Sequence, residues 1–328
     1  MARFSYGGQA LIEGVLMRGR DAIAVALRHP DGRILWSAEQ LGAGFRGTRW
    51  AKLPFMRGLV VLYETLVIGT RWLIRSAGVA AAEELGPATT PDGRPADVAE
   101  LGKGSVAIML GITLVLGLGL FFFAPLLIAR FVAGEQPDVV ERVVEGVVQV
   151  AIFLGYLVLI GRTPDVRRTF QYHGAEHMTI HALEAGDPLT VDEVRKYPTA
   201  HPRCGTEFLV VVILVSIFVF SLVGRQDLPV MILSRIVLIP VIAAVSYELL
   251  RFGARHRGNA LVRALSAPGM WVQKITTKQP SDDMIEVAIV SMEQAIAADG
   301  EELPAGGGAI EREPLLLAGA PSTPAAGG

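Results

Sequence analysis

The chain has little of what would mark a secreted or a nucleic-acid-binding protein. It contains one cysteine, Cys204, in 328 residues, so an internal disulfide is excluded and its stability cannot depend on an oxidising compartment. Its 30 Lys and Arg nearly balance 32 Asp and Glu, for a net charge of -2. Because a polyanion-binding domain should be strongly basic, we exclude nucleic acid as a partner. Glu13 and several glycines interrupt the N-terminal apolar stretch, so we expect no signal peptide.

Apolar residues are abundant, at 51% of the chain against 19% charged residues. A helix that crosses a bilayer needs about 20 predominantly apolar residues. Four segments approach or exceed this length and are predicted to span the membrane: 105–129, 143–161, 208–224 and 228–250. The predicted fold is therefore mainly α, a polytopic membrane protein with about four transmembrane helices, a small N-terminal β-hairpin region and cytoplasmic helices, in contact with the lipid bilayer.

The distribution of basic residues predicts an orientation. Thirteen Lys and Arg precede residue 105, six lie in the loop 162–207, and seven follow residue 250. In a four-helix topology these three regions share one side of the membrane, which the positive-inside rule makes cytoplasmic. We therefore expect both termini and the loop 162–207 in the cytosol.

One apolar segment carries a regular pattern of charges. Arg57, Glu64 and Arg71 are seven residues apart within 53–74, which places them on one helical stripe. We interpret 53–82 as an amphipathic helix at the cytoplasmic interface. The alternative is a fifth span whose charged stripe faces the bundle interior, which would reverse the topology.

The N-terminal region, residues 1–52, contains two strand-like runs, 22–27 and 33–39, joined by the turn sequence Pro30-Asp31-Gly32. This pattern predicts a β-hairpin. The glycine-rich stretch 7–19 is interpreted as a tight loop against the site, with Glu13 or Arg18 available to an anionic headgroup or ligand.

The other regions are assigned from composition and capping signals. Ser281 is a suitable N-cap for a final helix that packs on the cytoplasmic face. The remaining predicted regions are a linker at 83–104, the transmembrane region 105–250, a cytoplasmic C-terminal region at 251–298 and a disordered tail at 299–328.

The strongest chemical pattern is H-x-x-E-H at 173–177, in the loop between the second and third spans. Thr163-Pro164 is typical of a helix start and Gly186 of a helix end, so one helix is predicted from about 164 to 185. On that helix His173, Glu176 and His177 share a face. Two imidazoles could hold a divalent metal, with zinc the first candidate, while the Glu176 carboxylate acts as general base on its water.

Further ligands are sought in the sequence His201-Pro202-Arg203-Cys204, just before the third span. His201 is predicted as the third ligand. Cys204, beside Arg203 and a helix start, could have a depressed pKa and serve as ligand or thiolate, or be a small buried hydrophobe. Glu248 lies near the inner end of the fourth span and either joins the site or forms a plain ion pair. The competing interpretation of the whole pattern is a cluster of polar groups that cap helices and pair with arginines.

Five sequence blocks together resemble one family. They are GGQALIEGVLMRG at 7–19, YHGAEHMTIHALE at 172–184, HPRCGTEF at 201–208, SYELLR at 246–251 and PGMWVQKITTKQPSDDMIEVAI at 268–289. The chain resembles the YqhQ family of uncharacterised bacterial membrane proteins, often labelled predicted metal-dependent enzymes, over about residues 6–292. The resemblance implies a bacterial inner (plasma) membrane. By motif position it nominates His173, Glu176, His177, His201, Arg203, Cys204 and Glu248.

Three functional hypotheses follow from these patterns. The first is a metal-dependent hydrolase with a cytoplasm-facing site. The second is a non-catalytic scaffold or assembly factor that binds a membrane-protein partner or anionic lipid through its hairpin, basic loops and final helix. The third is a transporter, since Arg235 and Glu248 are ionisable groups within a span, although four helices without a clear repeat give it little support. Neither the substrate nor the oligomeric state is predicted.

Overall fold

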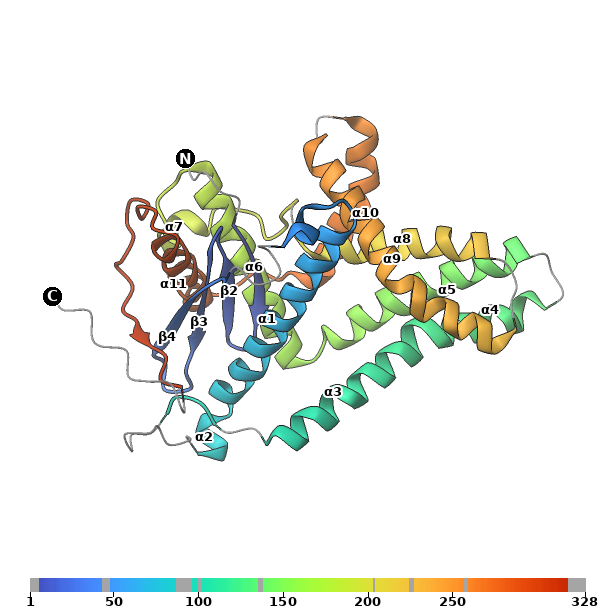
Figure 1. Ribbon diagram of the computed structural model, residues 1–328. Coiled ribbons are helices and arrows are strands. Elements are labelled where there is room, and N and C mark those ends of the chain that lie inside the picture. The colour runs from blue at the N-terminus through green and yellow to red at the C-terminus, as the bar shows by residue number, and fades with distance from the viewer. Residues whose placement is uncertain are drawn as a thin grey trace.

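A sheet covered by helices and an elongated bundle of apolar helices occupy opposite ends of the molecule (Figure 1). The computed structural model describes residues 6–42, 48–86, 96–99, 102–134, 138–202, 204–223, 227–256 and 259–317. Within these residues the mainly helical fold with a small N-terminal sheet confirms the predicted fold class.

The sheet is an antiparallel meander closed at one edge by a short parallel strand. Its order is β1 (Gly7–Leu11), β2 (Gly14–Arg18), β3 (Ala22–Arg28), β4 (Ile34–Gln40) and β5 (Glu313–Pro314). The predicted hairpin is the β3–β4 pair, whose turn contains Gly32 at a φ of 93°. The interpretation of residues 7–19 as a loop is wrong, since this stretch forms the β1–β2 hairpin. Its small residues allow close backbone approach, which resembles a loop signal in sequence.

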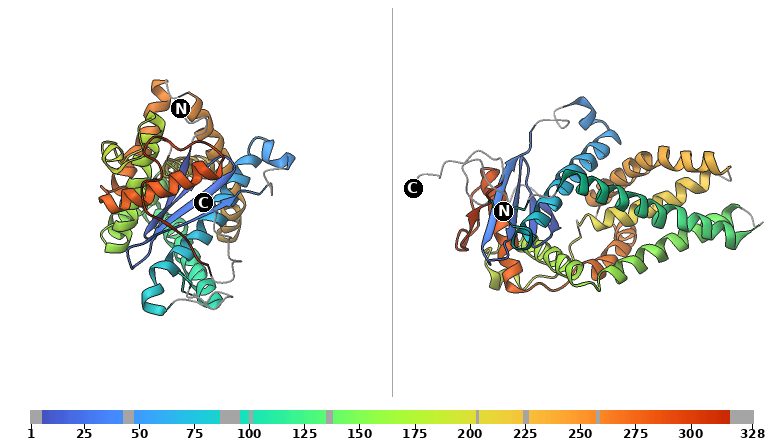
Figure 2. Two further views of the ribbon diagram at one scale, coloured as in Figure 1. Left: turned by 90° about the vertical axis from the view of Figure 1, so that its left-hand side faces the viewer. Right: turned by 90° about the horizontal axis from the view of Figure 1, so that it is seen from below.

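Both faces of the sheet are covered, which explains why β2 and β3 are apolar runs without a polar face. Val15 and Ala24 face a cluster formed with helices α6 (Pro164–Ala185) and α11 (Asp282–Ala298). Leu16 and Val25 face the opposite cluster, which includes Trp72 of helix α1 (Met56–Ala80). Figure 2 shows α11 lying across one face of the sheet. The sheet is thus the middle layer between helices.

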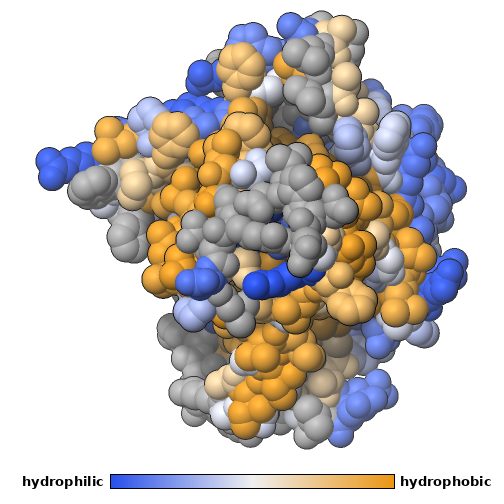
Figure 3. Space-filling view, turned by 90° about the vertical axis from the view of Figure 1, so that its right-hand side faces the viewer, coloured by the Kyte–Doolittle hydropathy of each residue, from blue (hydrophilic) through white to orange (hydrophobic). Residues whose placement is uncertain are grey.

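Four helical segments are long and apolar enough to cross a membrane, as predicted: Gly104–Ala133, Val140–Ile160, Thr206–Val223 and Pro229–Gly253. The first consists of α3 (Lys103–Leu118), a π-helical turn η3 (Gly119–Phe123) and α4 (Ala124–Ala133); the others lie in α5 (Asp138–Ile160), α8 (Thr206–Val223) and α9 (Leu228–Arg255). Figure 3 shows apolar side chains over much of the bundle surface, in keeping with Ile108, Leu114 and Phe131 being exposed. Such a surface requires a lipid environment.

The remaining helices surround the sheet and the inner ends of the bundle. They are η2 (Arg49–Lys52), α1 (Met56–Ala80), α2 (Ala82–Leu85), α6 (Pro164–Ala185), α7 (Val191–Val194), α10 (Ala260–Thr276) and α11 (Asp282–Ala298). Helix α1 corresponds to the segment predicted as amphipathic and is not among the four candidate spans. It packs on α9 and on the sheet through Gly58 and Gly69, where an added Cβ would lie 2.8 Å from Tyr247 and 2.3 Å from Gln9.

Part of the chain predicted as linker and tail is folded. Asp97 is buried, accepts a hydrogen bond from the Leu316 N–H at 2.8 Å and pairs with Arg33 at 3.4 Å. The predicted disordered tail from Asp299 is therefore wrong for residues 299–317, which run back to the sheet and add β5 beside β4. Composition suggested disorder because Gly, Ala and Pro dominate there, whereas the backbone gains hydrogen bonds at an open strand edge. Residues 318–328 lie outside the described residues.

Candidate metal centre

Helix α6 carries the H-x-x-E-H pattern with the predicted bounds, beginning after Thr163 and ending before Gly186 at a φ of 81°. Pro164 at N1 has no N–H to leave unbonded, and the positive φ at Gly186 carries no Cβ penalty. Its middle turns are buried between the edge strand β1 and α11. Packing on two sides therefore holds His173, Glu176 and His177 in a fixed orientation.

Two backbone carbonyls fix the tautomers of the imidazoles. The Nδ1 atom of His173 lies 2.9 Å from the carbonyl oxygen of Thr276, and that of His177 lies 2.6 Å from the carbonyl oxygen of Thr199. Because a carbonyl only accepts, each Nδ1 carries the proton and each Nε2 presents a lone pair. Metal-bound histidines are oriented by this kind of outer hydrogen bond.

Cys204 completes a group of three ligand atoms. Its Sγ lies 3.2 Å from the Nε2 of His173, and one ligand atom each of His173, His177 and Cys204 lie within 4.8 Å of one another. The Nε2 of His177 is buried and has no hydrogen-bond partner among the described residues. Two imidazoles and one thiol thus lie close together, an arrangement whose chemistry suits a metal ion.

The predicted third ligand, His201, lies beside this group of three. Its ring centroid is 5.7 Å from that of His177, it lines the same cavity, and its Nε2 lies 3.5 Å from Glu184 Oε2. Glu248 is held elsewhere, by the Arg57 guanidinium (Nε to Oε1, 2.7 Å) and the Phe55 N–H at 3.0 Å, so it forms the ion pair weighed as its alternative role. Arg203 lies outside the described residues.

Gln273 is a positioning residue that the sequence patterns missed. Its side chain, 1% exposed, accepts the His201 N–H at 2.9 Å and donates to the His201 carbonyl at 3.0 Å. This pair of bonds fixes the segment that leads to Cys204 against α10. A glutamine in an apolar helix carries no motif, although it lies within one of the five resembling blocks, at 268–289.

The Glu176 carboxyl is buried beside the group. Burial raises its pKa to about 8, against opposing contributions from His173 and from the Gly8 N–H, which donates to the carboxylate. Its Oε2 has no hydrogen-bond partner among the residues that the structure describes. An added Cβ on Gly8 would lie 3.0 Å from this carboxylate and 2.5 Å from the Leu16 carbonyl oxygen, so only glycine lets β1 pass so close.

Burial also controls the protonation of the ligand side chains. It lowers the pKa of His177 to about 2, so this imidazole is neutral, as a metal ligand must be. It raises the pKa of the Cys204 thiol, partly offset by hydrogen bonds from Thr206. The thiolate suggested by the neighbouring Arg203 is therefore not favoured by the protein alone, and a bound cation would have to stabilise it.

The group opens onto a cavity of about 500 Å³ between α6, the sheet, α1 and the inner ends of α8 and α9. Glu176, His177 and Cys204 form one wall of this cavity. The cavity is large enough for a small-molecule ligand.

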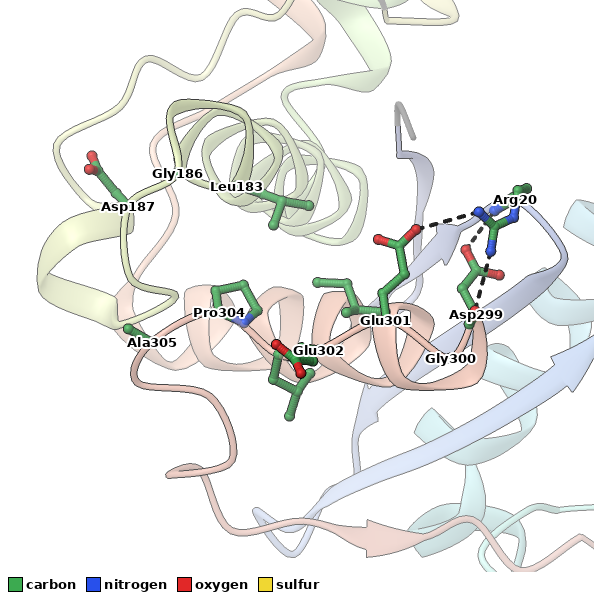
Figure 4. A pocket seen from close by; sticks show the side chains of 12 residues that line it. Arg20, Leu183, Gly186, Asp187, Asp299, Gly300, Glu301, Glu302, Pro304 and Ala305 are labelled. Carbon is green, nitrogen blue, oxygen red and sulfur yellow. Dashed lines mark hydrogen bonds and ion pairs between the residues drawn. The ribbon is translucent and has the colours of Figure 1, made fainter. Parts of the chain in front are cut away.

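A larger cavity of about 790 Å³ lies where the end of α6 meets the chain after α11 (Figure 4). Two of its acidic side chains, Asp299 and Glu301, contact the β2–β3 turn. Asp299 accepts the N–H groups of Arg20 at 2.7 Å, Asp21 at 2.9 Å and Ala22 at 3.0 Å, and Arg20 pairs with Glu301 at 3.6 Å. We interpret these contacts as structural, since they attach the C-terminal segment to the sheet.

Fold and site together define a helical membrane protein in which a His/Cys group lies near the ends of the candidate spans that adjoin the sheet. Residues 53–298 match the family described as "Protein of unknown function (DUF1385)", and the chain belongs to this family. It is 30% identical over 301 residues to "Uncharacterized protein YqhQ" of Bacillus subtilis (strain 168), covering 89% of this chain and 92% of the Bacillus protein. No solved structure matches the chain.

Proposed function

We propose that this chain is a metal-dependent hydrolase of the bacterial inner membrane with its site on the cytoplasmic side. The observation that carries the proposal is the convergence of two imidazoles, each bonded through Nδ1 to a backbone carbonyl, and a thiol within 4.8 Å, with His177 and Cys204 on the wall of a cavity. The orientation rests on the basic residues, which concentrate in the three regions on the sheet side of the spans.

The donor set favours zinc. Two nitrogens and one sulfur with an open fourth position are the ligand count of catalytic zinc sites. Thiolate and imidazole donors disfavour magnesium and calcium, which prefer oxygen. Copper is the competing metal for two histidines and a cysteine, and it differs from zinc in its spectrum. His173, His177 and Cys204 would hold the metal, with Cys204 losing its proton on binding.

Glu176 is the proposed acid–base group. It lies on the cavity wall next to His177 in the sequence, with a buried carboxyl oxygen that has no hydrogen-bond partner among the described residues. A cation bound beside Glu176 would favour its ionised form. The carboxylate would then take one proton from the attacking water and return it to the leaving group, while the hydroxyl joins the acyl or phosphoryl centre, so the reaction needs no other reactant. The metal, when bound, polarises the water and the substrate.

Cobalt substitution tests the donor set. Full-length protein in detergent is stripped with a chelator and titrated with Co²⁺, and its near-ultraviolet absorption is recorded. A sulfur-to-cobalt charge-transfer band is expected in the wild type, absent in Cys204→Ser and preserved in His29→Ala, which changes a histidine in the β3–β4 turn. A band that survives Cys204→Ser would contradict the assignment of this ligand.

Glu176→Gln tests the role of the carboxylate. Hydrolysis of p-nitrophenyl esters and phosphates is measured on metal-loaded protein, with Glu286→Gln on α11 as control. The account expects turnover to fall by about 100-fold or more in Glu176→Gln, with metal content unchanged. If the two variants hydrolyse the panel at equal rates, Glu176 is not the base, and a scaffold role becomes the better interpretation.

A further inference from the structure

The cavity at the proposed metal centre extends to the membrane-spanning helices. On the side of the group it is lined by Glu176, His177 and Cys204, and on the far side by Tyr247 of α9. Cys204 and Gly205 directly precede the candidate span Thr206–Val223. Tyr247 lies six residues inside the candidate span Pro229–Gly253, roughly 9 Å along a helix from its end. The cavity therefore lies at the level of the lipid headgroups on the inner side.

Helix α1 forms the outer wall of the cavity. Val61, Thr65 and Ile68 line the cavity at a spacing of one helical turn. The opposite face of the same turns is apolar and exposed: Tyr63 is 56%, Leu66 59% and Val67 49% accessible. A helix that is apolar on both faces, and is charged at Arg57 and Arg71, suits a position between the cavity and the bilayer surface.

Helix α1 contacts its neighbours closely on either side of the cavity. Gly58 packs on Tyr247 and Gly69 packs on Gln9, and both approaches are closer than any side chain would permit. Between these glycines, along three turns, the helix faces the cavity with Val61, Thr65 and Ile68. The space under α1 is thus open along the segment that faces the metal centre.

The side chains that line the cavity favour a ligand with an apolar chain and a polar headgroup. Besides the α1 residues, the cavity is lined by Leu16, Ile23 and Ile180, whose side chains offer no hydrogen bonds. Polar groups gather at the metal centre, and Arg18 stands at the α1 side, held by Glu64 at 2.9 Å and by Thr65 at 3.2 Å. A fully water-soluble substrate would gain nothing from the apolar walls, whereas burial of a chain there is favourable.

We propose that the substrate is a membrane lipid, whose polar end reaches Glu176 and His177 while one apolar chain lies under α1 between Val61 and Ile68. This inference rests on the proposed hydrolase function for its chemistry, but the binding claim can be tested alone. The volume of about 500 Å³ suits a headgroup and part of one chain. The rest of the lipid stays in the bilayer beside α1.

Photolabelling in vesicles tests the inference. The full-length protein is reconstituted into phosphatidylethanolamine and phosphatidylglycerol vesicles containing a lysophosphatidylglycerol with a diazirine in its chain. After irradiation, adducts on the β1–β2 hairpin are counted by mass spectrometry, because this hairpin lines the cavity behind α1. Val61→Trp fills the cavity, while Val67→Trp places the same side chain on the exposed outer face.

The expected result is labelling of the hairpin in wild type and Val67→Trp, with about a tenfold loss in Val61→Trp because the chain is excluded sterically. Thr65→Trp, at an exposed position on the cavity rim, gives a second blocking variant, which loses the hydrogen bonds of the Thr65 hydroxyl to Arg18 and to the Val61 carbonyl. Unlabelled hairpin in the wild type, equal labelling in Val61→Trp and Val67→Trp, or displacement of the probe by soluble glycerophosphoglycerol would each overturn the inference.

Metal content measured on the same samples separates the two proposals. If metal is bound at one equivalent but the hairpin is not labelled, the lipid inference fails and the metal centre stands. If no metal is bound but labelling depends on Val61, the hydrolase proposal fails and the cavity is supported as a lipid-binding site.

Discussion

Gln273→Leu should weaken metal binding although this side chain is not a ligand. The amide makes two hydrogen bonds to the backbone of His201, with N···O distances of 2.9 and 3.0 Å, and it is almost fully buried. Leucine is close in volume to glutamine but can neither accept nor donate. The segment 199–204, which carries the Thr199 carbonyl and Cys204, would lose its link to α10.

The expected loss of metal affinity in Gln273→Leu can be estimated from two quantities, the cost of the unpaired backbone groups and the usual effect of losing an outer hydrogen bond. A buried backbone group left without a partner costs about 1–3 kcal/mol, so holding the segment in place would cost about 2–6 kcal/mol for the two groups. The segment is expected to relax before the full cost is reached, moving Cys204 away from His173. Loss of such an outer hydrogen bond typically weakens metal binding by about 10–100-fold, equivalent to about 1.4–2.8 kcal/mol.

Competition against a chromophoric zinc chelator measures this change on full-length protein in detergent. Gln171→Leu is the matched control, since Gln171 lies on α6 and makes one exposed hydrogen bond, to the Gln279 carbonyl at 3.1 Å. The control should bind zinc within about twofold of wild type, as surface substitutions usually have small effects. Equal zinc affinity and equal thermal midpoints for Gln273→Leu and wild type would refute the positioning role.

Three further substitutions test other parts of the structure. Gly174→Ala would place a Cβ 2.2 Å from the Lys278 carbonyl oxygen, and we expect a loss of about 1–3 kcal/mol, seen as a lower thermal midpoint, whereas Gly155→Ala, with open space around it, should have little effect. Asp299→Ala removes the acceptor of three N–H groups in the β2–β3 turn. We expect a loss of about 2 kcal/mol in the free energy of unfolding, seen as a lower thermal midpoint, without a change in metal content. Glu248→Gln should weaken the contact of α1 with α9, detected as faster proteolysis of α1, and should leave metal content unchanged. Metal loss in this variant would show that Glu248 acts at the site.

Patterns within a single segment of the sequence predicted those elements whose formation depends mainly on residues close together in the chain. The candidate spans were predicted from the length of the apolar runs, which must match the thickness of a bilayer. The bounds of α6 were predicted from Pro164 and Gly186, because the residues at a helix end determine where the helix begins and ends. The turn at Gly32 was recognisable for the same reason. His173 and His177 could be placed on one face since helical spacing alone brings them together.

Contacts between distant segments were beyond these signals. Cys204 lies close to the two histidines in a segment whose backbone is hydrogen-bonded to Gln273, which is far along the chain. The β1–β2 hairpin was not predicted because Gly8 serves close packing against Glu176 and Gly14 close packing against β3, rather than a turn. The folded part of the tail depends on an open edge of β4, which composition does not reveal.

The most direct test of the metal centre is elemental analysis of the full-length protein purified in detergent without added metal or metal-affinity resin. We predict about one equivalent of zinc per chain in the wild type. We predict near-complete loss in His173→Ala combined with His177→Ala, and retention in His29→Ala. A wild-type protein without stoichiometric zinc, manganese, iron or copper, or a double variant with unchanged metal content, would contradict the central claim.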